Sequence, residues 1–200
     1  MGRKEFISDG KYFIYPIANE DREDYMELRR QIHGETTLFK NPVTMDMMWE
    51  VALNGVTKVY SIYNSENRYC GSIELQNPTS ETPEIGIELL ENFRNKGIAP
   101  TVILMFVRAV CDQQNVQHFI IKIAASNSHS RHIFDKLGAE FIGEEESFYK
   151  KIVKMYKEMC KSSEKAYELA KRYEADDEPV YVYKLHTDIV MPSVTYDKKN

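Results

Sequence analysis

The residues with the clearest capacity for chemistry lie in a short turn, Arg94-x-x-Gly97-x-Ala99, between a strand-like run and an apolar helix. Small residues in such a turn let successive backbone N–H groups approach an anion closely. The N-terminus of the following helix adds a partial positive charge, and Arg94 and Lys96 flank the turn. The pattern predicts a pyrophosphate site, and an ordinary helix N-terminus is the alternative for so short a motif.

A second polar segment, Asn127-x-x-Ser130 followed by RHIFDKLG, comes after the β-branched run HFIIKIAAS. This segment and the earlier run GIELLENFRNKGIA resemble, in their order along the chain, the two coenzyme A motifs of the GCN5-related N-acetyltransferase (GNAT) superfamily. The Asn-x-x-Ser form is similar to the branch that acetylates ribosomal-protein alanine N-termini (RimJ/RimL-like). The resemblance covers residues 11–143, with residues 180–185 as the last strand.

The resemblance implies direct transfer of an acetyl group from acetyl-coenzyme A (acetyl-CoA) to a primary amine in a ternary complex. The implied acceptor is a small-molecule amine or a protein N-terminal amine, and no metal is expected. The resemblance also implies which residues bind the coenzyme. They are Leu89, Leu90, Arg94, Asn95, Lys96, Gly97, Ile98, Ala99, Thr101, Asn127 and Arg131.

Ser130 is the residue that the resemblance implies as the proton donor to the departing thiolate. Many members of the superfamily use a Tyr for this step, but this chain has Phe134 there, and a phenyl ring has no proton to donate. A Ser in a first helical turn is also a good capping residue, so a helix cap is the alternative role for Ser130. Backbone N–H groups near Leu89 and Leu90 would hold the thioester carbonyl, and Asn127 would hydrogen-bond the pantetheine arm.

A general base is needed because an alkyl amine is mostly protonated at neutral pH. We expect Glu88 to be this catalytic residue, since it lies on the strand beside the coenzyme motif. Strand alternation places Glu88 on the face opposite Ile87 and Leu89. Glu84 and Glu74 are further choices, a chain of waters could also take the proton, and each carboxylate could instead be a solvated side chain on a strand face.

Two other groups of side chains invite a functional interpretation. His129 and His132 share one predicted helix, but no third ligand follows at a recognisable spacing, so we expect surface histidines and no metal site. Trp49 lies among three methionines of the second predicted helix. Such a cluster is typical of a core, and in the GNAT fold this region also borders the acceptor-amine cleft.

Hydrophobic periodicity and turn signals predict an α/β (α+β) chain. The predicted strands are 12–17, 57–63, 69–75, 84–90, 118–124, 139–143 and 180–185, and the predicted helices are 21–32, 44–54, 100–111 and 126–137. Thr44 is expected to cap the second helix, and Pro100 to open the third. The apolar run at 118–124 predicts a central strand that is buried on both faces. The resemblance implies a GNAT fold, in which helices flank both faces of a mixed, mostly antiparallel sheet.

Residues 148–173 change to a helical spacing of apolar residues. Residues 150–174 hold eight Lys or Arg against four Glu, a net charge of +4 within an acidic chain. We interpret residues 147–178 as a helical insertion before the last strand, within a single N-acetyltransferase domain of residues 1–200. Its basic face is either a solvated helix face or a partner surface, which would cover the acceptor cleft or build a homodimer.

Composition limits the classes of protein that this chain can be. Its 26 basic and 31 acidic residues give a net charge of −5, which excludes a general nucleic-acid binder. The apolar run at 102–107 is too short to span a membrane and the N-terminus lacks a signal peptide, so we expect a cytoplasmic protein with no membrane partner. Cys70, Cys111 and Cys160 are widely separated, which favours free thiols over disulfides or zinc ligands.

A rival hypothesis keeps the coenzyme site and removes the chemistry. The chain would then be a non-catalytic acyl-CoA-binding or partner-binding module on the same fold. Phe134 in place of the usual Tyr and the absence of an obvious base motivate this alternative. Release of free thiol in the presence of an amine would decide for the enzyme.

Overall fold

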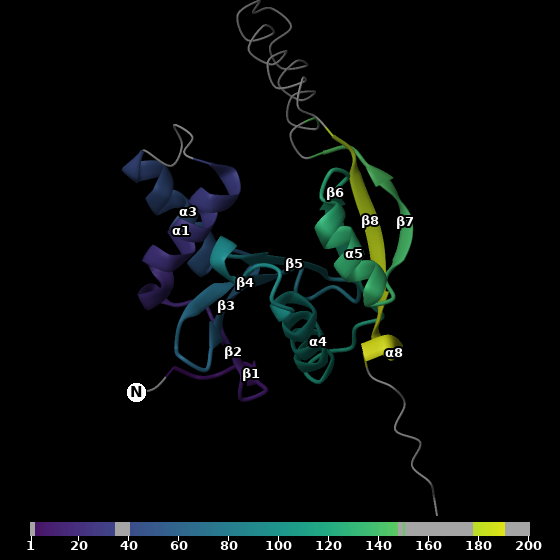
Figure 1. Ribbon diagram of the computed structural model, residues 1–200, viewed down its shortest axis with the longest axis horizontal. Coiled ribbons are helices and arrows are strands. Elements are labelled where there is room, and N and C mark those ends of the chain that lie inside the picture. The colour runs from purple at the N-terminus through teal and green to yellow at the C-terminus, as the bar shows by residue number, and fades with distance from the viewer. Residues whose placement is uncertain (1–2, 35–40, 148–149, 151–177, 191–200) are drawn as a thin grey trace, which may run out of the picture. The chain divides into compact units, whose positions relative to one another are not determined.

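The computed structural model describes residues 3–34, 41–147, 150 and 178–190 (Figure 1). Its strands are β1 (Ile7–Ser8), β2 (Tyr12–Pro16), β3 (Lys58–Asn64), β4 (Tyr69–Gln76), β5 (Glu84–Leu89), β6 (His118–Ala124), β7 (Glu140–Glu145) and β8 (Val180–His186). Its helices are α1 (Arg22–His33), α3 (Pro42–Asn54), α4 (Ile98–Cys111), α5 (Ser128–Lys136) and α8 (Thr187–Val190), with short 3₁₀ turns η1 (Asn19–Asp21) and η2 (Glu91–Phe93). All the predicted elements outside the insertion are present at or near their predicted bounds, whereas β1 and α8 were not expected.

Contacts divide the chain into two compact units, Met1–Ile120 with Leu185–Asn200, and Ile121–Lys184. In the first unit, β1 to β5 form an antiparallel meander, and β5 pairs in parallel with β6 where Glu84 lies opposite Ile120. In the second unit, β8 pairs antiparallel with β7. The eight strands are hydrogen-bonded in the order β1-β2-β3-β4-β5-β6-β8-β7, so the predicted mixed, mostly antiparallel sheet is confirmed.

Helices cover both faces of the sheet in the first unit, because neighbouring side chains of a strand point to opposite faces. On β3, the Ser61 hydroxyl donates a hydrogen bond to Asp21, which precedes α1. The adjacent Tyr60 packs on Phe106 of α4, with ring centroids 5.0 Å apart. One face of the sheet therefore lies under α1 and the other under α4, as the fold class predicts.

The starts of two helices differ from their predictions. Asn41, not Thr44, caps α3, since its side-chain oxygen accepts a hydrogen bond from the Val43 N–H at 2.9 Å. Helix α4 begins at Ile98, so Pro100 is its third residue and does not open it. Pro is tolerated at this position because N–H groups of a first helical turn have no intrahelical partner.

Strand β6 also differs from its prediction. Phe119, Ile121 and Ile123 are buried, but Lys122 between them is exposed. The strand therefore buries one face only, and the prediction that both faces are buried is wrong. A run of β-branched residues does not distinguish these two cases, because Val, Ile and Thr favour strands of either kind.

Some predictions lie outside the described residues. These are most of the helical insertion at 147–178 and the thiol of Cys160. Within the described residues, Cys70 and Cys111 are free cysteines, as expected. No helix in this part of the chain is both long and apolar enough to cross a membrane.

Candidate active site

The turn before α4 has the backbone geometry of an anion site. Asn95 and Gly97 adopt left-handed conformations, with φ of 59° and 73°, and Gly97 is the N-cap of α4. No side chain caps this helix, so the N–H groups of its first turn keep their capacity to bind an acceptor from elsewhere. Ile98 and Ala99 bury their side chains, and only their backbone can face a ligand.

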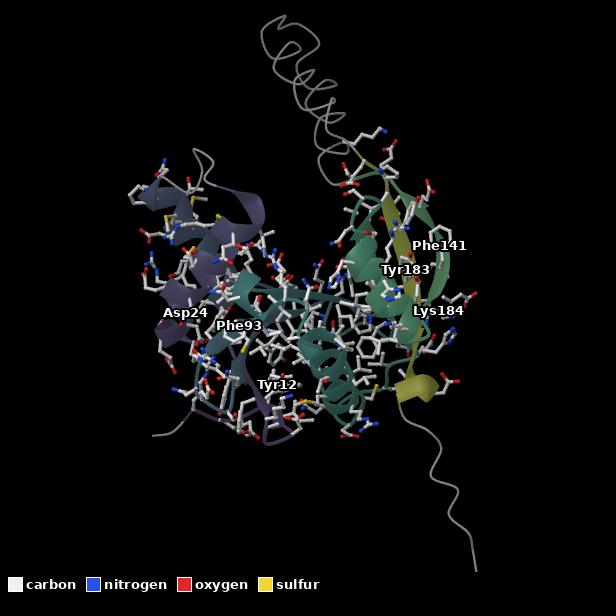
Figure 2. The ribbon with its side chains drawn as sticks, in the orientation of Figure 1. Tyr12, Asp24, Phe93, Phe141, Tyr183 and Lys184 are labelled. Atoms are coloured by element: carbon white, nitrogen blue, oxygen red, sulfur yellow. The ribbon has the colours of Figure 1, made fainter. Side chains whose placement is uncertain are left out.

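Basic side chains surround this turn. The Nε of Arg94 donates to the carbonyl oxygen of Leu89 at 2.9 Å. Phe93, labelled in Figure 2, lies beside two of them: the centre of its ring is 5.7 Å from the Nζ of Lys96 and 5.6 Å from the Arg68 guanidinium. Sequence reasoning missed Arg68, because this residue comes from the turn between β3 and β4 and only the folded sheet brings it to Phe93.

The structure gives the backbone N–H of Leu90 and the side chain of Thr101 hydrogen-bond partners within the protein. The N–H of Leu90 donates to the carbonyl oxygen of Cys70 at 3.0 Å, so it is not available to a thioester carbonyl. Successive N–H groups of a strand point to alternate edges, and the N–H of Leu89 therefore points away from β4. The Thr101 hydroxyl donates a hydrogen bond to the carbonyl oxygen of Gly97 at 3.2 Å, and this bond stabilises the first turn of α4.

In the second unit, Asn127 is the N-cap of α5. Its side-chain oxygen accepts a hydrogen bond from the Ser130 N–H at 3.0 Å. The alternative role of Ser130 as the helix cap is therefore wrong. Among the described residues the half-buried Ser130 hydroxyl has no hydrogen-bond partner, and so it keeps a proton to donate.

Phe134 and Arg131 are neighbours of Ser130 on α5, and both pack within the protein. Phe134 is only 4% exposed, which makes it a core residue. The guanidinium of Arg131 lies 5.3 Å from the centre of the Tyr181 ring on β8. Arg131 was predicted to bind the coenzyme, and the structure shows this residue packed on an aromatic ring of β8.

The predicted general bases lie in the first unit, on the face of β4 and β5 that α1 covers. Glu88 forms an ion pair with Arg29 of α1, with Nη1 and Oε2 2.5 Å apart. Glu74 lies opposite Gly86 in the β4–β5 register. Burial, together with the negative charge of Glu88, raises the pKa of Glu74 to about 7. Glu74 is thus a carboxylate that titrates near neutral pH.

A comparison with protein-family models matches an acetyltransferase (GNAT) domain to residues 12–140, which is more than half of the chain. The chain belongs to the GNAT acetyltransferase family. A search of curated proteins finds no match.

Solved structures of other acetyltransferases share the GNAT fold of this chain. Spermidine N-acetyltransferase from Vibrio cholerae, in complex with CoA and spermine, matches with a TM-score of 0.65 and 11% identity, over 92% of this chain and 99% of that chain. Ribosomal-protein-S5-alanine acetyltransferase from Vibrio fischeri matches with a TM-score of 0.61 and 14% identity, over 92% of this chain and 97% of that chain. A ribosomal L7/L12 α-N-protein acetyltransferase matches with a TM-score of 0.61 and 13% identity, over 92% of this chain and 98% of that chain. At these identities, the likeness confirms the fold.

The turn of this GNAT domain fits a coenzyme phosphate. A Cβ placed on Gly97 would meet no atom within 4 Å, so an anion can approach the backbone there. The uncapped N-terminus of α4 supplies N–H donors, and the exposed Arg94 and Lys96 supply positive charge. The residues present therefore suit the phosphate-bearing ligand that their sequence predicted.

Several other candidates of this GNAT domain have structural explanations. His129 and His132 are exposed on α5, and the described residues contain no group of three His, Cys, Asp or Glu side chains that could hold a metal. Trp49 is 5% exposed and packs on Tyr25 with ring centroids 6.0 Å apart, so it is a core residue. Burial raises the pKa of Cys70 to about 11, which keeps this thiol protonated at neutral pH.

Proposed function

We propose that this protein is an N-acetyltransferase that transfers an acetyl group from acetyl-CoA directly to a primary amine. The observation that carries the proposal is the uncapped N-terminus of α4, with the left-handed Gly97 at its start and Arg94 and Lys96 beside it. This feature supports binding of the coenzyme pyrophosphate. Family membership supports acetyl transfer in general, and the proposal adds the direct mechanism and the amine.

Each proposed residue has a separate task. The N–H of Leu89 stabilises the oxyanion that forms on the thioester carbonyl. The Ser130 hydroxyl gives a proton to the departing thiolate, and its lack of a partner among the described residues supports this role. Asn127 keeps its amide NH₂ group for the pantetheine arm, because the cap uses its oxygen. A carboxylate on the α1 face of β4 and β5 takes the proton of the amine.

The proposed acceptors are a small-molecule amine and a protein N-terminal amine. The structural neighbours cover both classes, since they include a spermidine N-acetyltransferase and ribosomal-protein acetyltransferases. The Asn-x-x-Ser form at Asn127 and Ser130 favours the branch that modifies protein N-termini. A non-catalytic acyl-CoA-binding module remains a second candidate function, because the buried Phe134 has no proton to donate.

Isothermal titration of the full chain with acetyl-CoA tests the coenzyme site. Lys96→Gln should weaken binding, because it removes a charge beside the turn. Lys11→Gln is the matched control, since Lys11 also lies over a ring, 5.2 Å from the centre of Tyr12, but far along the chain from the motif. No binding at millimolar acetyl-CoA would overturn the proposal.

Thiol release separates the enzyme from the binding module. The amines in the assay are n-butylamine, spermidine and a peptide with an N-terminal alanine. Ser130→Ala should lower kcat by about 10²-fold, within the range for loss of a general acid, and leave the Kd for acetyl-CoA unchanged. Binding without thiol release from any of the three amines would favour the non-catalytic module.

A further inference from the structure

Glu74 and Glu88 lie on adjacent strands but differ in their partners. Glu88 forms an ion pair with Arg29, whose side chain is 17% exposed. Glu74 forms no hydrogen bond and no ion pair within the described residues, although its side chain is half-buried beneath α1. Buried polar groups normally have a partner, and one that has none is a candidate for binding a ligand.

The surroundings of Glu74 leave room for a ligand. Gly86 lies directly opposite Glu74, and a Cβ on Gly86 would meet no atom within 4 Å. Because side chains at i and i+2 of a strand share a face, Ser72, Glu74 and Glu88 all point to the α1 side of the sheet. The Ser72 hydroxyl is fully buried and has no hydrogen-bond partner among the described residues. Two polar side chains without partners and an open space thus occur together.

We propose that Glu74, and not Glu88, binds the ammonium group of the acceptor and takes its proton. In this assignment the ion pair of Arg29 and Glu88 is a positioning pair, which holds the second carboxylate away from the amine. The assignment rests on the proposed function and names the general base for it. It replaces Glu88, the base that the sequence predicted, because the guanidinium of Arg29 already occupies that carboxylate.

The proton balance follows from the net reaction. Glu74 takes one proton from the ammonium group, and the neutral amine then attacks the thioester carbon, which forms the C–N bond. The C–S bond breaks, the nitrogen loses its second proton, and the leaving sulfur gains one. Glu74 returns its proton to water, so each turnover yields an amide, a free thiol and one released proton.

Ionisation of Glu74 is set by groups on α1 and β5. Burial is the main cause that raises its pKa to about 7, the charges of Glu88 and Glu84 contribute to this rise, and the charge of Arg29 opposes it. Tyr25 of α1 also faces Glu74, and burial raises the pKa of Tyr25 so that it stays neutral. Glu74 accepts a proton only in its ionised form, so kcat/KM should fall as the pH drops below about 7.

The first experiment compares Glu74→Gln with Glu27→Gln in the thiol-release assay. Glu27 is the matched control because it is an exposed glutamate of α1 that pairs with Arg30. Glu74→Gln should lower kcat/KM by about 10²- to 10⁴-fold, the usual contribution of a general base. Its Kd for acetyl-CoA and its unfolding midpoint should match those of the wild type. A folded Glu74→Gln protein with wild-type kcat/KM would overturn the assignment.

The second experiment uses the pH profile, which a purely structural role would not move. Glu88→Gln removes a like charge and should shift the acid limb of kcat/KM to lower pH. Arg29→Gln removes the opposing charge and should shift the limb to higher pH, and Arg29→Lys should restore it. Identical acid limbs in folded Glu88→Gln and Arg29→Gln proteins would contradict the proposal.

A binding readout keeps this assignment separate from the proposed function. The carboxyl carbon of Glu74, assigned in a ¹³C spectrum by its loss in Glu74→Gln, should shift saturably as n-butylammonium chloride is added. The shift should disappear in Gly86→Val, which fills the open space. Saturable binding without thiol release would support the amine site at Glu74 and contradict the proposed catalytic function. Thiol release without any shift of the Glu74 signal would support the catalytic function and contradict the amine site at Glu74.

Discussion

Asp21 anchors the N-terminal segment of the first unit through a complete set of hydrogen bonds. Its carboxylate is fully buried. Arg3 donates to it with two nitrogens, and Ser61, Tyr63 and the Ala18 N–H donate to it at 2.7, 2.6 and 2.9 Å. Burial acts to raise the pKa of Asp21, but the hydrogen bonds from Arg3, Tyr63 and Ser61 outweigh it and lower the pKa below its ordinary value. Asp21 is therefore a structural residue and, unlike Glu74, has no capacity left for a ligand.

We predict that Asp21→Asn lowers the free energy of unfolding by about 3–5 kcal/mol, because it leaves the Arg3 charge without its partner. Urea unfolding followed by circular dichroism measures this loss. Asp46→Asn is the control, since Asp46 pairs with Arg22 at 2.5 Å but is 68% exposed, and the expected change is within about 0.5 kcal/mol. Equal losses in the two variants would contradict the prediction.

The loss of folding stability at low pH should also depend on Asp21. Because the folded pKa of Asp21 is depressed, its contribution is complete above the ordinary value of 3.8 and is lost as the pH falls through the folded value. Unfolding midpoints measured from pH 6 downward should therefore fall less steeply below about pH 4 in Asp21→Asn than in the wild type. If the unfolding midpoints of both proteins fall equally steeply with pH, other carboxylates control the loss of stability at low pH.

At the scale of elements, the close approach of β4 to β5 at Gly71 fixes the end of β5 that carries the proposed oxyanion donor. A Cβ on Gly71 would lie 2.1 Å from the carbonyl oxygen of Glu88 and 2.8 Å from the Cα of Leu89. Both contacts are backbone atoms, which cannot move without displacing the strand. Gly71 is thus required for the pairing of β4 with β5.

We predict that Gly71→Ala lowers the free energy of unfolding by about 1–3 kcal/mol through overpacking. Turnover should fall as well, because the displaced strand carries Leu89. For stability, Gly86→Ala is the matched control on the neighbouring strand, where no atom lies within 4 Å of the new Cβ. A glycine in a strand interior is unfavourable, so the stability of Gly86→Ala should be unchanged or slightly higher. A stable, fully active Gly71→Ala protein would refute this account.

Helix α5 permits a test that separates capping from coenzyme binding at one position. Asn127→Asp keeps the oxygen that accepts the Ser130 N–H but removes the amide NH₂ donor. We predict that Asn127→Asp retains the unfolding midpoint and binds acetyl-CoA more weakly, whereas Asn127→Ala loses about 1 kcal/mol of stability in addition. Calorimetry and thermal unfolding of both variants check this. Unchanged acetyl-CoA affinity in Asn127→Asp would leave Asn127 as a cap alone.

At the scale of the whole molecule, the basic segment before β8 can be removed without touching the residues proposed for catalysis. The deletion must keep Glu178, because the N–H and hydroxyl of Ser126 donate to its carboxylate at 2.6 and 2.8 Å. We predict that replacing residues 151–177 with a short Gly-Ser linker leaves the Kd for acetyl-CoA unchanged. Loss of acetyl-CoA binding would show that the segment contributes to the coenzyme site.

The same deletion decides between the roles proposed for the segment. Turnover with the three amines and the mass from light scattering should be compared with those of the full chain. A solvated appendage leaves both unchanged, a cover of the acceptor site changes turnover alone, and a homodimer contact halves the mass. Each result selects one of the alternatives that the charge of +4 left open.

Local sequence determined the elements and the coenzyme turn. The period of apolar residues marks helices and strands, and a Gly before a helix without a capping side chain exposes backbone N–H groups wherever it occurs. These are interactions between neighbours in the chain, and so Arg94, Lys96 and Gly97 could be recognised directly. The cap of α5 does not follow from local sequence, because Asn127 and Ser130 are both good capping residues and only the folded turn selects Asn127.

Only the tertiary structure decided which glutamate has a partner. Arg29 and Glu88 are far apart in the chain, and the packing of α1 on the sheet brings them within 2.5 Å. The same packing buries Glu74 opposite a glycine and leaves its carboxylate without a partner among the described residues. Charge and exposure depend on contacts between distant segments, so the sequence named three candidate carboxylates and only the fold separated Glu74 from Glu88.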